Sequence, residues 1–449
     1  MNEWRSGLIL TIIALFFLDR FFNLPYGEKI LAGLTLLVII ISIPISRGIP
    51  KIFGSLMLVI GTLILLGKDS GIDEWAQSMI RNLPLMALIV LVPILTIPIK
   101  LGGYDSNIES ITNRYRSKPN LLFLSISIVF QMIGPVVNLG SIRLIDAMLK
   151  KLKLPAEFLG KVYIRGFTSI ITWSPYFAAV LLILYYVDIP LVSYLPFGIL
   201  LGLLQLIIGN LLFIKEAKKI EFPEITESHE NNRWKIFELI VAFSILTSIV
   251  FFFEYWLQMD MIMIVALSVF IFPFFWSLYL KSFRRFIQSL NYYRKYIVPG
   301  TSNEVILFLT AGFFGAVLSN TSIGLLINDG LRYLAETSIL LMIILTIILT
   351  SLLALFGVHQ IVTLISVASS VIASDLGIEK VVFALLLMSA WSVSTIVSPI
   401  TPVNVIVSSL INKKPLQVSL KWNGVHALLV ISAHTLYIYL VHIWISGGK

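Results

Sequence analysis

Cysteine is absent from the 449 residues of the chain, and so is a glycine-rich phosphate-binding loop. Without cysteine the protein has no disulfide bonds, no thiolate nucleophile and no iron–sulfur cluster, although the cellular compartment stays open. The missing phosphate-binding loop argues against ATP as the source of energy. The apolar segments also hold no convergent set of acids, bases or metal ligands. We therefore predict that the protein is not an enzyme and has no cofactor apart from sodium ions.

Charged residues are scarce: they make up 13% of the chain, whereas 58% of its residues are hydrophobic and the mean hydropathy is +0.94. A water-soluble protein of this length needs far more polar surface, so the composition predicts an integral membrane protein. The apolar runs 7–22, 30–45 and 237–256 are near the length that crosses about 30 Å of hydrocarbon as a helix. No small-residue cleavage site follows the first run, so we expect it to be retained rather than removed as a signal peptide.

Acidic residues are missing beside two Ser-Pro pairs, Ser174-Pro175 and Ser398-Pro399, each of which interrupts a long apolar run. Proline lacks an N–H and clashes with the carbonyl four residues earlier, so each pair predicts a broken membrane helix with freed backbone groups. Such groups are tolerated where they line a cavity or are buried in protein, which makes the paired breaks a candidate binding site. The alternative is a pair of proline kinks that only shape packing. The missing carboxylates argue against a sodium/proton antiporter.

The two breaks belong to a longer pattern of matched residues. Pro399 follows Pro175 by 224 residues, Gly357 follows Gly134 by 223, and Gly315 follows Pro93 by 222. This shared offset predicts two homologous halves. We predict an extra N-terminal helix (1–24), a first repeat (25–214, with scaffold 25–120 and transport part 121–214), a cytoplasmic linker (215–235) and a second repeat (236–449, with scaffold 236–337 and transport part 338–449).

The repeats are expected to be inverted, which requires an odd number of crossings between equivalent segments. This holds if 121–150 is a re-entrant hairpin, whose entering arm 121–133 would extend only about 20 Å as a helix. Most of the 33 basic residues then fall in loops on one side, so the positive-inside rule places the N-terminus in the cytoplasm and the C-terminus outside. The fold predicted is an all-α polytopic membrane protein with about eleven transmembrane helices, two hairpins and two broken helices, in the cell membrane.

Two further features follow from the same pattern. Segments 73–82 and 283–297 occupy matching places in the two halves and are interpreted as interfacial amphipathic arms, with a plain loop as the alternative for the first. The formal charge of +9 is spread over many short loops rather than forming one patch, so nucleic acid is excluded as a partner.

The order of helices, arm, hairpin and broken helix resembles the divalent-anion/sodium symporter family of the ion transporter superfamily. The breaks at Ser174-Pro175 and Ser398-Pro399 match that family, whereas the hairpin tips "GPVVNLGS" (134–141) and "GVHQIVT" (357–363) lack its Ser-Asn-Thr motif. A literal Ser-Asn-Thr at 319–321 falls in the helix before the second hairpin. The resemblance implies a homodimer and an elevator movement of hairpins and broken helices against a scaffold.

Candidate site residues are the polar groups at the hairpin tips and breaks. The predicted substrate-binding set is Asn138, Ser141, Thr172, Ser174, His359, Gln360, Thr395, Ser398, Thr401 and Asn404. The predicted sodium ligands are neutral oxygens, which suit a hard cation, from Asn138, Gly140, Thr172, Ser174, Thr363 and Ser398. Serine and threonine also serve as interhelical packing residues, and a buried histidine is commonly only hydrogen-bonded. Arg165 is expected to snorkel to the cytoplasmic surface, which would leave no fixed cation at depth.

These observations favour a secondary active transporter of a small anionic solute, coupled to sodium rather than protons, with membrane lipid and a second copy of the chain as partners. One alternative is the membrane subunit of a binding-protein-dependent transporter. Another is an intramembrane enzyme or a lipid-phosphate translocase.

Overall fold

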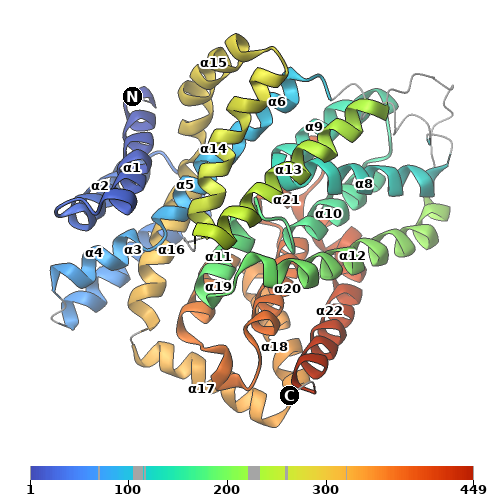
Figure 1. The fold of residues 1–449 in the computed structure, drawn as a ribbon. Coiled ribbons are helices and arrows are strands. Elements are labelled where there is room, and N and C mark those ends of the chain that lie inside the picture. Colours follow the sequence, from blue (N-terminus) through green and yellow to red (C-terminus); the bar gives the residue numbers. More distant parts are fainter. Residues whose placement is uncertain are drawn as a thin grey trace. The chain divides into compact units, whose positions relative to one another are not determined.

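The computed structural model describes residues 2–68, 71–104, 115, 118–220, 233–257, 261–319 and 321–447. Over these ranges the chain folds into helices without a β-strand (Figure 1). Nine helical stretches within them are long and apolar enough to cross a membrane. The protein is therefore an all-α polytopic membrane protein, as its composition predicted.

The first half contains the helices up to the predicted linker. In chain order they are α1 (Asn2–Phe22), α2 (Gly27–Ser42), α3 (Ile49–Gly67), α4 (Ile72–Ile80), α5 (Leu83–Leu91), α6 (Thr96–Leu101), α8 (Pro119–Val137), α9 (Gly140–Leu149), α10 (Ala156–Ile171), α11 (Ala178–Val187) and α12 (Leu191–Glu216). A short 3₁₀ segment, Val92–Leu95, joins α5 to α6. Pro93 lies within it, and its missing N–H accounts for the interruption of the α-helical bonds.

The second half follows the predicted linker. Its helices are α13 (Arg233–Leu257), α14 (Met261–Tyr279), α15 (Phe283–Tyr292), α16 (Ser302–Ser319), α17 (Ser322–Thr337), α18 (Ile339–Leu355), α19 (Gln360–Ser370), α20 (Lys380–Val397), α21 (Pro402–Leu410) and α22 (Trp422–Ser446). The two predicted amphipathic arms are both helical, since they form α4 and α15. The structure thus excludes the plain loop for the first arm.

The two predicted hairpins are pairs of helices. α8 turns into α9 at Asn138, whose φ of 54° is left-handed, and α18 is followed by α19 after a turn at Gly357, with φ of 106°. The prediction of a short entering arm at 121–133 is wrong, because α8 spans 19 residues and would extend about 28 Å, long enough to cross. Pro135 lies in the last turn of α8, where it removes only one hydrogen bond and does not end the helix.

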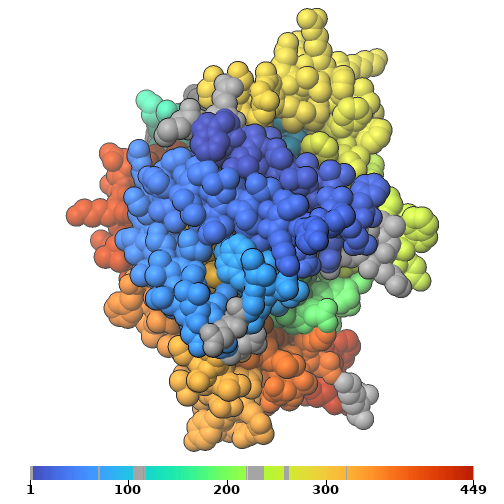
Figure 2. Space-filling model, turned by 90° about the vertical axis from the view of Figure 1, so that its left-hand side faces the viewer, coloured from blue at the N-terminus to red at the C-terminus, as the bar shows by residue number. Residues whose placement is uncertain are grey.

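Tertiary contacts group the chain into two compact units. Unit 1 contains Met1–Ile97, Met259–Arg332 and Ile361–Ile372. Within it, α3 packs tightly on α16: a β-carbon on Gly54 would lie 2.2 Å from Ile306, and one on Gly61 would lie 2.7 Å from Phe313. Small residues at such contacts let membrane helices approach closely. Figure 2 shows the N-terminal helices of this unit, in blue, as a continuous surface of side chains.

Unit 2 contains Pro98–Gln258, Tyr333–Gln360 and Ala373–Lys449. Its centre is formed by the broken helices, because 94% of the most apolar window of Lys380–Leu410 is buried, against 22% for Phe237–Trp256 on α13. A helix that is apolar all round is stable only when neighbouring protein or lipid surrounds it. The broken helices therefore occupy the interior of unit 2, and α13 lies at its surface.

The equivalence of the two halves stays a prediction, as do the domain boundaries 25–214 and 236–449. The predicted linker 215–235 lies partly outside the described residues, which omit 221–232.

The packing of unit 1 generates a stability prediction for Gly312 on α16. A β-carbon there would lie 2.2 Å from Cγ of the buried Asn82, whose Nδ2 donates to the carbonyl of Phe308 at 2.9 Å. Gly312→Ala should displace Asn82 and lower the stability by about 1–3 kcal/mol. The melting temperature of the purified protein in detergent measures the effect. Gly330→Ala on α17, where no atom lies within 4 Å, is the control and should not lower it.

Candidate functional site

The first helix break has the geometry that Ser174-Pro175 predicts. α10 ends at Ile171 and α11 begins at Ala178, so the chain is not helical between them. The amides of Trp173 and Ser174 both bond the carbonyl of Ile170 at 3.1 Å. The hydroxyl of Ser174 donates to the carbonyl of Pro135 on α8 at 3.0 Å. The break is thus attached to the first hairpin.

The second break repeats this arrangement. α20 ends at Val397 and α21 begins at Pro402. The hydroxyl of Ser398 donates to the carbonyl of Ala354 on α18 at 2.7 Å. In both halves, therefore, the serine of the Ser-Pro pair bonds a backbone carbonyl near the end of the first hairpin helix. The predicted breaks are confirmed, and the serines have a physical role that the kink alternative does not supply.

The two broken helices are bonded to each other inside unit 2. Ser392 on α20 donates to the carbonyl of Thr168 on α10 at 3.0 Å, and these residues are 224 positions apart. Gln205 on α12 bridges the same pair: its Nε2 donates to the Thr168 hydroxyl at 2.8 Å, and its Oε1 accepts from Ser392 at 2.9 Å. Gln205 was not among the predicted site residues. Its signal in the sequence is an amide within the apolar run of α12.

Each hairpin also supplies a glutamine to the broken helix beside it. Nε2 of Gln131 on α8 donates to the hydroxyl of Ser169 at 2.8 Å, and its Oε1 accepts from the indole of Trp173 at 3.3 Å. Nε2 of Gln360 donates to the hydroxyl of Thr395 at 3.5 Å. Gln360 was predicted as a site residue and Gln131 was missed. The hairpins are therefore held to the breaks by side chains as well as by the Ser-Pro serines.

The start of α21 is organised by Thr401 and Asn404. The Thr401 hydroxyl caps α21 by accepting from the amide of Asn404 at 3.5 Å. The side-chain nitrogen of Asn404 lies 2.8 Å from the carbonyl oxygen of Thr395 and 2.9 Å from that of Ser398. Both side chains are buried, so the freed carbonyls at the end of α20 are satisfied by α21.

The first break is satisfied from a different element, α12. The phenol of Tyr194 donates to the carbonyl of Thr172 at 2.5 Å. A β-carbon on Gly202 would lie 2.5 Å from the carbonyl oxygen of Ser169, so glycine is required for α12 to approach this closely. The Thr172 hydroxyl donates to the Ser169 carbonyl at 3.0 Å.

Other predicted residues have local roles or lie elsewhere. Asn138 forms the first hairpin turn: its Oδ1 accepts from the amide of Leu139 at 2.7 Å, and its carbonyl accepts from the Ser141 hydroxyl at 2.6 Å. Thr363 belongs to unit 1, whereas the rest of the predicted set belongs to unit 2. Unit 2 brings the following together through hydrogen bonds at or next to the breaks: Thr172, Ser174, Gln360, Thr395, Ser398, Thr401 and Asn404.

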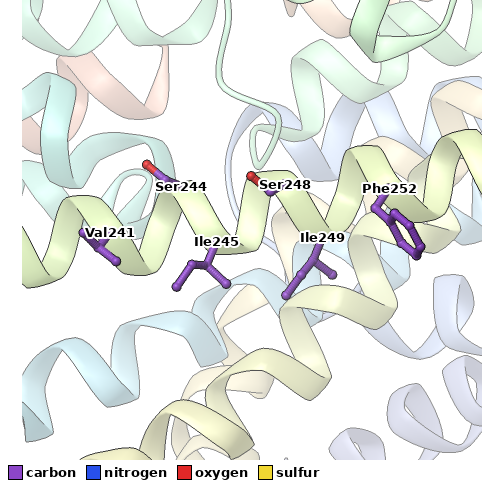
Figure 3. Close-up of a pocket in the computed structure, with 6 residues that line it drawn as sticks. All are labelled: Val241, Ser244, Ile245, Ser248, Ile249 and Phe252. Carbon is purple, nitrogen blue, oxygen red and sulfur yellow. The ribbon is translucent and has the colours of Figure 1, made fainter.

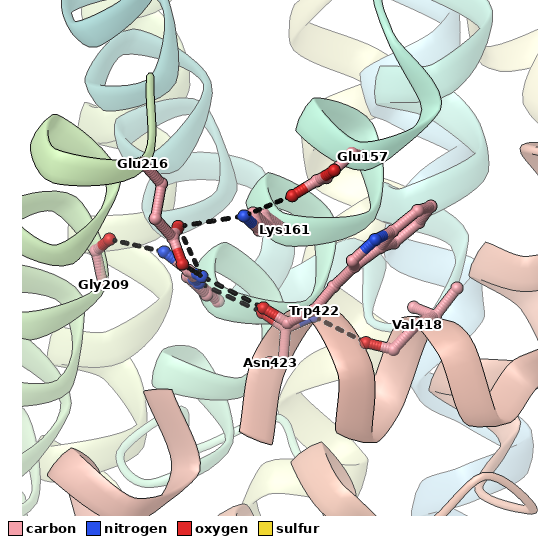
Figure 4. Close-up of polar contacts among 8 residues, drawn as sticks. Glu157, Lys161, Gly209, Glu216, Val418, Trp422 and Asn423 are labelled. Carbon is pink, nitrogen blue, oxygen red and sulfur yellow. Dashed lines mark hydrogen bonds and ion pairs between the residues drawn. The ribbon is translucent and has the colours of Figure 1, made fainter. Parts of the chain in front are cut away.

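The expectation that Arg165 snorkels to the surface is wrong. Its guanidinium is buried in α10 and lies 2.9 Å from the Glu216 carboxylate, while Nε donates to Oδ1 of Asn423 at 3.0 Å (Figure 4). Lys161 joins the network through Glu157 at 2.6 Å and Glu216 at 3.3 Å. Because the acid on α12 pairs with it, the arginine stays inside. A fixed positive charge is therefore present inside unit 2, but the Glu216 carboxylate neutralises it.

Two buried histidines on α22 were also missed from the sequence. His434 Nδ1 lies 2.9 Å from the Ser389 hydroxyl, and His426 packs where Arg165 meets Gly209. Within the described residues, no group of three His, Asp or Glu side chains is placed to hold a metal ion.

One open depression lies along α13 in unit 2 (Figure 3). It is lined by Val241, Ser244, Ile245, Ser248, Ile249 and Phe252. None of these was predicted as a site residue, and the lining comes from a single, largely exposed helix. Such a surface suits lipid chains. The polar contacts at the breaks, rather than this depression, define the candidate site.

No protein-family model matches the chain, and no curated protein matches it in sequence. Among solved structures, the chain is similar to the Alcanivorax borkumensis YdaH transporter, whose crystal structure is described as revealing an unusual topology. The TM-score is 0.55 at 14% identity, over 82% of this chain and 86% of that chain. The chain therefore has a fold known from a membrane transporter. A transporter fold is thus supported, whereas the resemblance to the divalent-anion/sodium symporters in particular stays a prediction.

Removal of the Ser174 hydroxyl should loosen the attachment of the first hairpin. Ser174→Ala leaves the carbonyl of Pro135 without this donor in an apolar interior, so we expect a loss of about 1–3 kcal/mol. The melting temperature in detergent measures it. Ser432→Ala on α22 removes an exposed hydroxyl bonded to its own helix and should have almost no effect. Equal effects of the two substitutions would contradict the attachment.

The ion pairs of unit 2 give a second comparison. Glu216→Gln leaves Arg165, which is 1% exposed, without its counter-ion, and should cost about 2–4 kcal/mol. Asp188→Asn breaks the pair with Lys380, whose side chains are 90% and 52% exposed, and should cost under about 1 kcal/mol. Thermal unfolding of the two variants in the same detergent tests this order. A reversed order would show that the Arg165 network is not a structural charge pair.

Proposed function

We propose that the protein is an ion-coupled secondary transporter of a small anionic solute, from a branch of the ion transporter superfamily. The observation that carries this proposal is the direct bond between the two broken helices, Ser392 to Thr168, with a hairpin attached to each break. Broken helices at mid-membrane offer half-helix ends and freed carbonyls to ions. The similarity of the fold to a transporter supports the same reading.

The electrostatics of the breaks favour coupling to a cation. The groups at both breaks are hydroxyls, amides and carbonyls, which are neutral, while the nearest buried cation, Arg165, is paired with Glu216. A bound anion would therefore need positive charge from a co-bound ion, because burying an unpaired charge is costly. Neutral oxygen ligands suit sodium better than a proton. The proposed sodium ligands are the oxygens of Thr172 and Ser174 at the first break.

The proposal includes a transport movement, an oligomeric state and an orientation in the membrane. The hairpins and broken helices would carry the solute against a scaffold in an elevator movement, in a homodimer in the cell membrane with the N-terminus in the cytoplasm. The alternatives from the sequence are the membrane subunit of a binding-protein-dependent transporter and a lipid-phosphate translocase. Uptake by the purified chain alone would separate the first alternative from the proposal, and uptake of a water-soluble solute would separate the second.

Proteoliposomes containing the purified protein test the transport hypothesis. Labelled small anions, including mono- and dicarboxylates, are screened with an inward sodium gradient, an inward pH gradient, or neither. We expect uptake of one solute class to rise several-fold with sodium, and His359→Gln to keep that sodium dependence because no carboxylate or histidine is needed. Uptake that follows the pH gradient, ignores sodium and disappears in His359→Gln would falsify sodium coupling.

A further inference from the structure

The side-chain nitrogen of Asn404 lies in a cage of four oxygen atoms. It is 2.8 Å from the carbonyl oxygen of Thr395, 3.2 Å from that of Ile396 and 2.9 Å from that of Ser398. The hydroxyl oxygen of Thr401 is the fourth, at 3.2 Å. Asn404 itself is fully buried. All four oxygens belong to the second break or to the residues that flank it.

The three carbonyls of the cage are met by three hydrogens. The Asn404 NH₂ group supplies two of them, and the Thr401 hydroxyl, 3.3 Å from the Thr395 carbonyl oxygen and 3.1 Å from that of Ser398, supplies the third. Three of the oxygens are backbone carbonyls and cannot donate, so the nitrogen rather than Oδ1 must face them. Oδ1 has no hydrogen-bond partner among the described residues. The end of α20 adds the partial negative charge of a helix C-terminus. Oxygens that converge in this way around one centre resemble the ligand set of a hard cation.

The first break has no such amide. The position 224 residues before Asn404, the offset that relates Thr168 to Ser392, is Val180, a buried apolar residue. The carbonyl of Thr172 accepts instead from the phenol of Tyr194, a donor that reaches in from α12. The two breaks are therefore chemically different although their serines act alike.

We propose that the Asn404 amide takes the place of a cation at the second break, so that no coupling cation binds there. The permanent NH₂ group supplies the partial positive charge that the freed carbonyls of α20 require. A cation entering the second break would have to displace it. The consequence for ion coupling rests on the proposed function, whereas the cage itself is a property of unit 2 alone.

Substitution of Asn404 tests the cage without a known substrate. Asn404→Asp puts a carboxylate among carbonyl oxygens, and Asn404→Ser removes the nitrogen without adding charge. Melting temperatures are measured at pH 8 in sodium chloride and in choline chloride of equal ionic strength. We expect sodium to raise the melting temperature of both variants by about 3 °C more than it raises that of the unmodified protein, since a ligand that binds only the folded state stabilises it.

Ser409→Asp is the matched control, because it adds the same charge to an exposed position of the same helix. It should respond to sodium as the unmodified protein does. No added sodium response in either Asn404 variant overturns the proposal, and Asn404→Ser alone decides if Asn404→Asp does not fold. If sodium raises the melting temperature of the variants but not that of the unmodified protein, the cage is supported and sodium coupling is refuted. If sodium raises the melting temperature of the unmodified protein and the variants show no larger rise, the cage is refuted and sodium coupling is supported.

Discussion

Unpaired backbone carbonyls in an apolar interior are the constraint on which the arrangement of unit 2 depends. Pro175 and Pro399 each remove a helical hydrogen bond, and a freed carbonyl in hydrocarbon costs several kcal/mol if nothing replaces it. Carbonyls beside the breaks are bonded instead by Tyr194 on the neighbouring α12 and by Asn404 on α21, the second part of the broken helix itself. These bonds hold α12 and α21 against the breaks. The packing of α12 and α21 is a consequence of the prolines as much as of apolar contact.

The buried charges of unit 2 are paired in the same way as its backbone carbonyls. Arg165 could have supplied a permanent positive charge near the breaks, but Glu216 and the amide oxygen of Asn423 neutralise and bond it. The breaks are left electrically neutral and lined by dipoles. A neutral, dipolar site can bind and release charged solutes without a fixed charge to hold them, which suits a transporter better than a permanent binding protein. In the proposed function, the binding of an anion would then depend on the cation that accompanies it.

The sequence predicted those features that depend on local chemistry. The proline positions located both breaks within a few residues, because a missing N–H interrupts a helix wherever it occurs. The apolar runs located the helices, because a membrane helix is a continuous apolar segment. The entering arm 121–133 was predicted too short, because α8 begins at Pro119 and continues through Pro135 to Val137. The partners of Arg165 and Ser392 were not predictable, because Asn423 and Thr168 are 258 and 224 residues away from them. Such pairs are fixed by tertiary packing, which periodicity does not describe.

The bond between Ser392 and Thr168 also constrains the symmetry of the molecule. If the halves are related by a two-fold rotation with an offset of 224, these two residues are equivalent, and equivalent residues touch only at the rotation axis. The axis would then pass between α10 and α20, each of which ends at one of the two breaks. Gln205 of the first half bonds both Thr168 and Ser392. The residue that precedes Asn404 by the same offset of 224 is the apolar Val180. Under that symmetry, equivalent backbone positions would carry different polar groups. A single small solute at the axis would then meet different chemistry on its two sides.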